Sequence, residues 1–215
     1  MAVPNPTPIY RFIHVDNLSV CLQRGGLHAP KHTPNDGLVY RPIHNPDIQA
    51  HRRVRQISCG PGGCIHDYVA FYFGYLSPMM LQLKTGRVEG YDEGQEPLIY
   101  LASTVQVVAE SGQDYVFSDG HGIATITEWF DDLSDLDAVD WQMVSQRYWA
   151  DTVDDMDRQR RKQAEFLVYK FCPWSLIQMI GVIDSDMNAK VQLILNEFSS
   201  NMHKAVRVKR SWYYY

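Results

Sequence analysis

The sequence is poor in cysteine, has no long apolar run and carries no excess of basic residues. Its 215 residues include four cysteines, and their spacing matches no disulfide framework. No apolar run approaches the roughly 20 residues that a helix needs to cross a bilayer. The first residues also lack the basic and then apolar regions of a secretory signal. These absences predict a cytoplasmic protein with reduced thiols and no membrane contact.

The overall composition is that of an ordinary globular protein. Hydrophobic residues make up 45% and charged residues 21% of the chain, which excludes a disordered or fibrous protein. The net charge of −5 excludes a wholly basic surface, so any contact with nucleic acid has to come from a local patch. Because glycine and proline are scattered rather than gathered into a linker, we expect one domain over residues 1–215.

Short β-prone runs alternate irregularly with helical segments. Composition predicts strands at residues 9–15, 68–75, 98–101, 115–117, 164–169, 180–183 and 206–215. Apolar spacing and capping residues predict helices at residues 17–24, 46–55, 104–110, 129–133, 141–148, 173–179 and 185–201. Residues 27–46 are rich in Gly, Pro, Asn and His and predict a long structured loop, which is usually functional. The pattern lacks the βαβ rhythm of a Rossmann sheet and predicts an α+β fold.

The motifs of several common active sites are missing. Cys59, Cys64 and His66 follow His51, but a structural zinc site needs a second ligand pair at similar spacing, so we predict no metal site. The glycine-rich turns at residues 60–63 and 120–122 lack the P-loop and dinucleotide motifs. No motif of a serine or cysteine nucleophile is present either.

Three apolar, β-like runs each contain one polar side chain that can carry chemistry: His14, Tyr72 and Glu165. A carboxylate in a core strand is costly unless it faces a cleft or has a partner. Two interpretations of Glu165 are therefore open, a cleft residue and a residue on the solvent face of an edge strand. Taken alone, His14 suits a hydrogen-bonded core histidine, and Tyr72 suits ordinary packing. Arg52, which follows the long loop, suits a surface salt bridge.

Basic residues gather in three short groups, at residues 52–55, 158–162 and 204–210, and an acidic stretch covers residues 128–157. Each basic group alone is typical of a solvated face. Three such groups on an acidic chain are also compatible with one basic groove, and the sequence leaves both interpretations open.

Taken together, these segments resemble the DarT family of bacterial DNA ADP-ribosyltransferase toxins, whose fold is related to the poly(ADP-ribose) polymerase-like transferases. The resemblance covers nearly the whole chain in the family's order. It runs through residues 9–18, 48–53, 67–73, 77–80, 118–121 and 163–168. It implies an ADP-ribosyltransferase-like fold, with central split antiparallel-rich β-sheets and peripheral helices.

The resemblance also implies NAD as co-substrate, without a metal. Cleavage of the nicotinamide–ribose bond passes through an oxocarbenium-like centre, as in glycoside transfer. By resemblance, Glu165 and Arg52 are the catalytic residues. The residues implied to bind NAD are His14, Tyr72, Arg52 and His121. Relatives often carry two arginines after the Ile-Gln element, where this chain has His51 and then Arg52; we assign the family arginine to Arg52, with Arg53 as the alternative.

The acceptor implied by the resemblance is a thymidine base in a short motif of single-stranded DNA. The candidate DNA-binding residues are Met79, Arg160 and Arg161. The implied partner is a macrodomain antitoxin that removes the modification, and the transferase is expected to be a monomer. Residues 27–46 are expected to close over NAD and to help form the DNA surface.

Two other classes of function stay open at this point. One is an ADP-ribosyltransferase that acts on guanosine, RNA or protein. The other is a non-catalytic module that binds single strands, with residues 210–215 stacking on bases; the alternative for this aromatic segment is a strand that packs on the sheet. Glu165 separates an enzyme from a simple binder, because a carboxylate repels phosphate.

Overall fold

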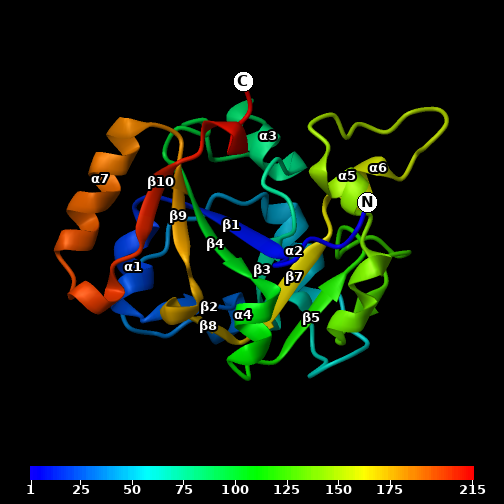
Figure 1. Ribbon diagram of the computed structural model, residues 1–215, viewed down its shortest axis with the longest axis horizontal. Helices are drawn as coiled ribbons and strands as arrows, with labels where there is room; N and C mark the ends of the chain where they lie inside the picture. The colour runs from blue at the N-terminus through cyan, green and yellow to red at the C-terminus, as the bar shows by residue number, and fades with distance from the viewer.

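A single large sheet organises the computed structural model, which describes residues 1–215 (Figure 1). Eight strands follow the spatial order β10-β9-β4-β1-β3-β7-β5-β6, and all neighbours are antiparallel except β9 and β10. Their bounds are β1 Pro8–His14, β3 Tyr68–Tyr72, β4 Leu98–Thr104, β5 Tyr115–Ser118, β6 Trp129–Phe130, β7 Glu165–Tyr169, β9 Met179–Val182 and β10 Ala205–Val208. Strands β2 (Gly26–His28) and β8 (Phe171–Pro173) form a second, small antiparallel sheet.

Seven α-helices surround the sheets, which confirms the expected α+β class with peripheral helices. They are α1 Asn17–Gln23, α2 Pro46–Val54, α3 Pro78–Lys84, α4 Val105–Glu110, α5 Trp141–Ser145, α6 Arg158–Lys162 and α7 Ser185–Asn196. Helix α7 lies beside β10 at one end of the sheet, and α5 and α6 lie at the other end (Figure 1). No helix is long and apolar enough to span a membrane.

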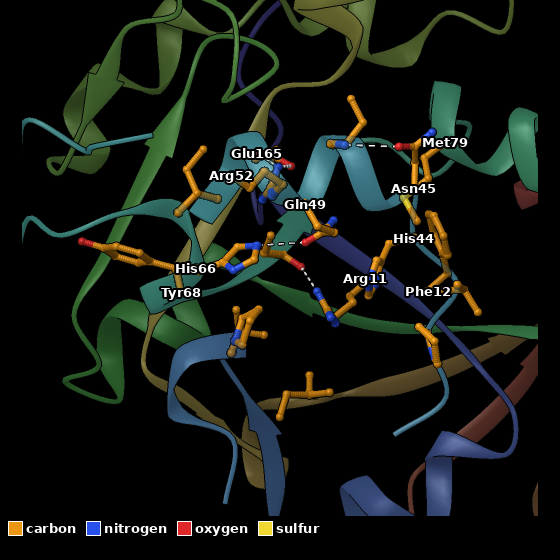
Figure 2. Close-up of a pocket in the computed structure, with 18 of the residues that line it drawn as sticks. Arg11, Phe12, His44, Asn45, Gln49, Arg52, His66, Tyr68, Met79 and Glu165 are labelled. Carbon is orange, nitrogen blue, oxygen red and sulfur yellow. Dashed lines mark hydrogen bonds and ion pairs between the residues drawn. The ribbon is translucent and has the colours of Figure 1, made fainter. Parts of the chain in front are cut away.

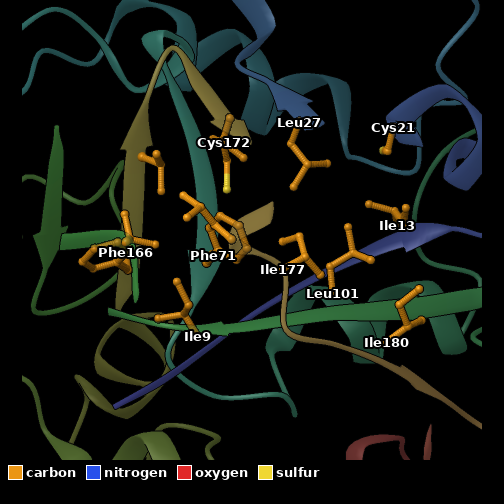
Figure 3. Close-up of a cluster of buried hydrophobic side chains, with 14 of the residues drawn as sticks. Ile9, Ile13, Cys21, Leu27, Phe71, Leu101, Phe166, Cys172, Ile177 and Ile180 are labelled. Carbon is orange, nitrogen blue, oxygen red and sulfur yellow. The ribbon is translucent and has the colours of Figure 1, made fainter. Parts of the chain in front are cut away.

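The main hydrophobic core lies on one face of the large sheet (Figure 3). Side chains alternate between the two faces of a strand, so Ile9 and Ile13 of β1 enter this core with Phe71 and Phe166 of the next strands. Phe12 points to the other face and joins a second cluster with Tyr100. Side chains on both faces of the central strands are buried, so the sequences of these strands are almost continuously apolar. The strands could therefore be predicted from composition.

Strand β7 is an interior strand, which decides between the two interpretations of Glu165. It pairs with β3 on one side and β5 on the other, and Glu165 lies directly opposite Tyr72. Opposite residues of an antiparallel pair project from the same face. Glu165 is only 1% exposed, so the interpretation as a solvent-facing residue of an edge strand is wrong.

Three expectations about secondary structure differ from the structure. Trp129 and Phe130 were expected in a helix but form β6, because their backbone pairs with β5 at Ser118 and Phe117. The segment after β8 contains a short 3₁₀ turn, Trp174–Leu176, instead of the start of an α-helix.

Residues 210–215 were expected to have strand character. They form a 3₁₀ turn, Arg210–Trp212, followed by irregular chain, and Trp212, Tyr213 and Tyr214 are buried in the second cluster. Their aromatic faces pack inside the protein and are not available to stack on bases.

Candidate functional site

A cavity of about 780 Å³ opens on the face of the sheet that carries Tyr72 and Glu165 (Figure 2). Strands β1, β3 and β7 contribute part of its wall, with α2, α3, α6 and the segment after β2. Its lining includes Arg11, His28, His44, Gln49, Arg52, Arg53, His66, Tyr72, Met79, Gln82, His121, Gln159, Gln163 and Glu165. The predicted loop at residues 27–46 supplies several lining residues. It therefore borders the cavity, as expected for a loop that closes over a ligand.

A buried ion pair occupies the centre of this wall. Nη1 of Arg52 donates to Oε1 of Glu165 at 2.8 Å and to Oε2 at 3.0 Å. Arg52 is 8% exposed and Glu165 is 1% exposed. Figure 2 shows the two side chains lying side by side. Taking both charges out of water costs several kcal/mol for each ion, so a pair in the wall of a cavity indicates a functional role.

Local sequence fixes the position of Arg52 on helix α2. The side chain of Asn45 accepts from the backbone N–H groups of Asp47 and Ile48, which caps α2, and Pro46 begins the helix. Six residues later, Arg52 lies on the buried side of α2, whereas His51 and Arg53 are exposed. Arg53 lines the cavity and His51 does not. Of His51, Arg52 and Arg53, only Arg52 contacts Glu165.

The turn at residues 119–122 leaves space for the Glu165 carboxylate. A Cβ atom on Gly122 would lie 3.0 Å from Oε2 of Glu165, so only glycine fits there without displacing a neighbour. The backbone N–H of Glu165 donates to Ser118 Oγ, and Ser118 donates to the carbonyl of Gly120. The start of β7 and the glycine turn are therefore joined by hydrogen bonds through Ser118.

Tyr72 faces the cavity beside Glu165. Burial, with a smaller contribution from the Glu165 charge, raises the pKa of Tyr72 above its usual value, so the phenol is neutral. Its hydroxyl contacts Sδ of Met79 at 3.9 Å, and its ring is nearly parallel to that of Phe12. Tyr72 and Met79, both expected in the site, thus lie together on the wall of the cavity.

His121 also lines the cavity. Its backbone N–H donates to the carbonyl of Arg160, and its carbonyl accepts from Thr127 Oγ1. Burial lowers the pKa of His121, and the nearby Arg52 charge acts in the same direction while the Glu165 charge opposes it. The imidazole is therefore neutral near pH 7 and can donate or accept one hydrogen bond.

His14 does not line the cavity, so its position gives no support to the expectation that it binds NAD. It lies at the end of β1, where Nε2 is 3.1 Å from Nη1 of Arg41 and Nδ1 is 3.2 Å from the backbone nitrogen of Asp16. Asn17 adds two hydrogen bonds to the backbone of Arg41. His14 and its neighbours therefore fasten the loop that borders the cavity.

Arg160 and Arg161 do not line the cavity either, and aspartates already occupy both guanidinium groups. Arg160 pairs with Asp157 at 2.7 Å and with Asp119 at 2.8 Å. Arg161 pairs with Asp140 and Asp155. These ion pairs give no support to the prediction that Arg160 and Arg161 bind DNA, because aspartates contact both guanidinium groups. The uncharged side chains of Gln159 in α6 and of Gln163, directly after α6, line the cavity instead.

The three basic groups do not converge into one groove. Arg52 and Arg53 line the cavity, and the second group pairs with the acidic stretch that precedes it. The third group lies around β10, at the far edge of the sheet. Strands β9, β4 and β1 lie between β10 and β3 in the sheet, so this third group is far from the cavity.

Arg11 is a cavity residue that the sequence interpretation missed. Its Nη1 donates to the carbonyl of Ala70 at 2.8 Å, and its Nε is buried without a hydrogen-bond partner. No carboxylate lies within ion-pair distance of Arg11. The reasoning that selected Glu165, a charged side chain in a β-like run, applies equally to Arg11 in β1 and would have found it.

The sequence did not predict Gln49 and His66 as cavity residues, and His66 was considered only as a zinc ligand. They meet at 3.0 Å between Oε1 and Nε2. Their helical and turn positions carry no distinctive pattern. No group of three or more His, Cys, Asp or Glu side chains has an arrangement that could hold a metal ion.

Comparison with known proteins gives consistent matches over the whole chain. The family model described as "ssDNA thymidine ADP-ribosyltransferase, DarT" matches residues 10–214. A DNA ADP-ribosyl transferase of Thermus aquaticus is 41% identical over 216 aligned residues, covering 100% of this chain and 92% of the relative.

Two solved structures of DarT from Thermus sp. 2.9 are also similar. The complex with ADP-ribosylated single-stranded DNA has a TM-score of 0.93 and 38% identity, covering 100% of this chain and 99% of that one. The complex with NAD+ has a TM-score of 0.89 and 37% identity, covering 99% and 100% of the two chains.

We predict that the free energy of unfolding decreases as the pH falls from about 6.5 towards about 4. Burial lowers the pKa of four histidines that line the cavity, His28, His44, His66 and His121, below their ordinary 6.5, and that of His66 to about 4. The unfolded chain takes up protons in this range that the folded chain does not, so protonation favours unfolding. Urea unfolding midpoints measured across the range check this.

In the same experiment, His66→Asn is expected to make the decline shallower, because one of the four proton-binding groups is gone. A midpoint that stays constant from pH 7 to about pH 4.5 would contradict the prediction.

Proposed function

The chain belongs to the DarT family of NAD-dependent DNA ADP-ribosyltransferases, and we propose that it modifies a thymidine base in a short motif of single-stranded DNA as the toxin of a toxin–antitoxin pair. The observation that carries the proposal is the buried Arg52–Glu165 pair in the wall of a cavity large enough for a dinucleotide. The description of the matching family as a thymidine ADP-ribosyltransferase supports the choice of base.

Glu165 is the residue that we assign to the reacting ribose. As the nicotinamide–ribose bond breaks, positive charge develops on the ribose, and a fixed carboxylate stabilises that charge. The same carboxylate can accept a hydrogen bond from the 2′-hydroxyl. Its position at the start of an interior strand keeps it rigid, so little reorganisation is needed during the reaction.

Arg52 is assigned to the pyrophosphate of NAD or to the incoming base. Both groups offer acceptor atoms to a guanidinium, and Arg52 already lies against Glu165 before substrate is present. Because only Nη1 contacts the carboxylate in this pair, the planar fork still has other N–H groups for a ligand.

Three further residues complete the proposed NAD site. Tyr72 offers an aromatic face to the flat, cationic nicotinamide ring, which its place beside Glu165 supports. His121 offers a neutral imidazole to NAD or to the target nucleotide. Arg11 has no counter-ion in the wall, so the negatively charged pyrophosphate suits it. Residues 29–45 supply the border of the cavity on this side.

The acceptor side of the cavity carries Met79, Gln159 and Gln163. Apolar and amide groups of this kind suit an unpaired base, whose Watson–Crick edge is free for hydrogen bonding. We keep Met79 as a DNA-binding residue. Arg160 and Arg161 are left out, because their ion pairs hold the protein's own segments together.

The biological setting follows from the same family membership. We propose a macrodomain antitoxin that removes ADP-ribose from DNA as the partner, and a transferase that works as a monomer in the cytoplasm, where bacterial DNA lies. Neither the large sheet nor the cavity needs a second chain to complete the Arg52–Glu165 pair.

We expect Glu165→Gln to lower the transfer of ADP-ribose to DNA by at least about 1,000-fold, because the amide cannot stabilise positive charge on the ribose. Affinity for single-stranded DNA should stay within about threefold, since the amide retains the size of the side chain. Transfer from labelled NAD to an oligonucleotide and a fluorescence anisotropy titration measure the two quantities.

The matched control for this prediction is Glu197→Gln, which removes an exposed carboxylate at the end of α7 and should keep full activity. Equal transfer rates in Glu165→Gln and in the unaltered protein would reject the catalytic role of Glu165.

Arg11→Gln is expected to raise KM for NAD by about 10- to 100-fold, because one charge-assisted hydrogen bond to NAD is lost. The value of kcat should stay nearly unchanged. Steady-state kinetics at saturating DNA measure both constants. Arg207→Gln, at an exposed position of β10, is the control for the loss of a positive charge. An unchanged KM for NAD in Arg11→Gln would exclude contact with the pyrophosphate.

The identity of the acceptor is tested with a random single-stranded oligonucleotide and NAD, followed by digestion and mass spectrometry. We expect the mass of ADP-ribose on thymidine only, with one preferred set of neighbouring bases. ADP-ribose found on guanosine would contradict the choice of base. ADP-ribose found on RNA or protein, in a mixture that also contains DNA, would contradict the choice of DNA as the acceptor.

A further inference from the structure

The hydroxyl of Tyr214 joins three segments that are far apart in the sequence. It donates to the carbonyl of Leu76 at 2.8 Å, with Ser77 O at 3.3 Å, and it accepts from Nε1 of Trp149 at 2.7 Å. Tyr214 is 7% exposed. One buried oxygen atom thus connects residues 212–215, the turn before α3 and the segment between α5 and α6.

The first of these connections leads to the cavity through α3. Ser77 caps this helix by accepting from the backbone N–H of Met80. The helix then carries Met79 and Gln82 into the wall of the cavity, where Met79 contacts the Tyr72 hydroxyl. A shift at residues 76–77 therefore moves the side chains that face the acceptor.

The second connection leads to the cavity through residues 146–157, the segment between α5 and α6. Nη2 of Arg147 donates to the carbonyl of Tyr215, next to the Trp149 contact. The segment continues directly into α6, and Gln159 of this helix and Gln163 directly after it line the cavity. Its side chains at Tyr148, Val153 and Met156 are 79%, 95% and 81% exposed. Exposed apolar and aromatic groups beside a cavity suit the flat faces of unpaired bases.

Tyr214 can serve as a fixed point because other contacts hold its backbone. Gln95 accepts from its N–H and donates to its carbonyl, and Lys84 also donates to that carbonyl. In Figure 1 residues 212–215 lie beside α3. Removing the hydroxyl alone therefore leaves residues 212–215 in place and frees only the two segments that it connects.

We propose that Tyr214 is a positioning residue for the DNA acceptor: its hydroxyl sets residues 146–149 and the start of α3 at the distance that single-stranded DNA requires. The inference rests on the proposed function, and it concerns only the acceptor side of the cavity. The NAD side is bordered by α2, β1 and residues 29–45, none of which contacts the Tyr214 hydroxyl.

The test is Tyr214→Phe, which removes one oxygen atom. KM for a single-stranded oligonucleotide is expected to rise about tenfold, because the variant loses a buried hydroxyl whose hydrogen bonds hold the acceptor side of the cavity in place. KM for NAD, and the slow hydrolysis of NAD in the absence of DNA, should stay the same. A loss of folding stability alone would leave the ratio of the two KM values unchanged.

Tyr213→Phe is the matched control. The neighbouring hydroxyl is also buried and donates to the carbonyls of Leu98 and Gly181, away from the cavity. This variant is expected to unfold at a lower temperature than the unaltered protein while both KM values stay unchanged. If Tyr213→Phe and Tyr214→Phe have the same kinetic effect, the proposal is wrong.

Trp149→Phe provides a second route to the same answer, should Tyr214→Phe fail to fold. It should raise KM for DNA by a similar factor, and the double variant should add little, because the two groups share one hydrogen bond. An unchanged KM for DNA in both single variants overturns the inference while the proposed function stands. Failure of the unaltered protein to modify any single-stranded DNA rejects the proposed function itself.

Discussion

The buried ion pair between Arg52 and Glu165 is the constraint around which the site is built. Two charges in the wall of a cavity are stable together only if helix α2 and strand β7 are held at hydrogen-bond distance. The Asn45 cap fixes where α2 begins, and pairing of β7 on both sides fixes Glu165. Gly122 leaves the space that the carboxylate occupies. Features that look independent in the sequence thus serve one pair.

Much of the fold could be predicted from the sequence, because strand composition and helix capping act locally. The same is true of Glu165 and Tyr72, whose polar atoms stand out in apolar runs. The ion pairs of Arg160 and Arg161 could not be predicted, because their partners Asp119 and Asp140 come from distant segments and composition does not show which charges pair. Trp129 and Phe130 were misassigned because pairing with β5 outweighed their local spacing.

Charge pairing also changes how DNA recognition should be viewed. Arg160 and Arg161 form ion pairs with aspartates of the acidic stretch, and these pairs connect α6 with residues 140–157. Affinity that came mainly from phosphate contacts would be sequence-independent and strongly salt-dependent. The acceptor site that we propose, formed by Met79, Gln159 and Gln163, would depend instead on base edges and faces, and this kind of contact favours a defined target motif.

His14 shows how a residue that does not line the cavity can hold a segment at its border. It lies in a segment that resembles the family, yet its ring holds Arg41 and, with Asn17, the loop beside the cavity. Tyr214 has the corresponding place on the acceptor side, where it holds α3 and residues 146–149. Buried polar groups outside the cavity thus fix its borders, and in the proposed function these borders set the geometry in which the Arg52–Glu165 pair meets donor and acceptor. Proximity and orientation of this kind can supply several kcal/mol of the barrier to a reaction, so we expect residues that do not line the cavity to affect the rate of transfer.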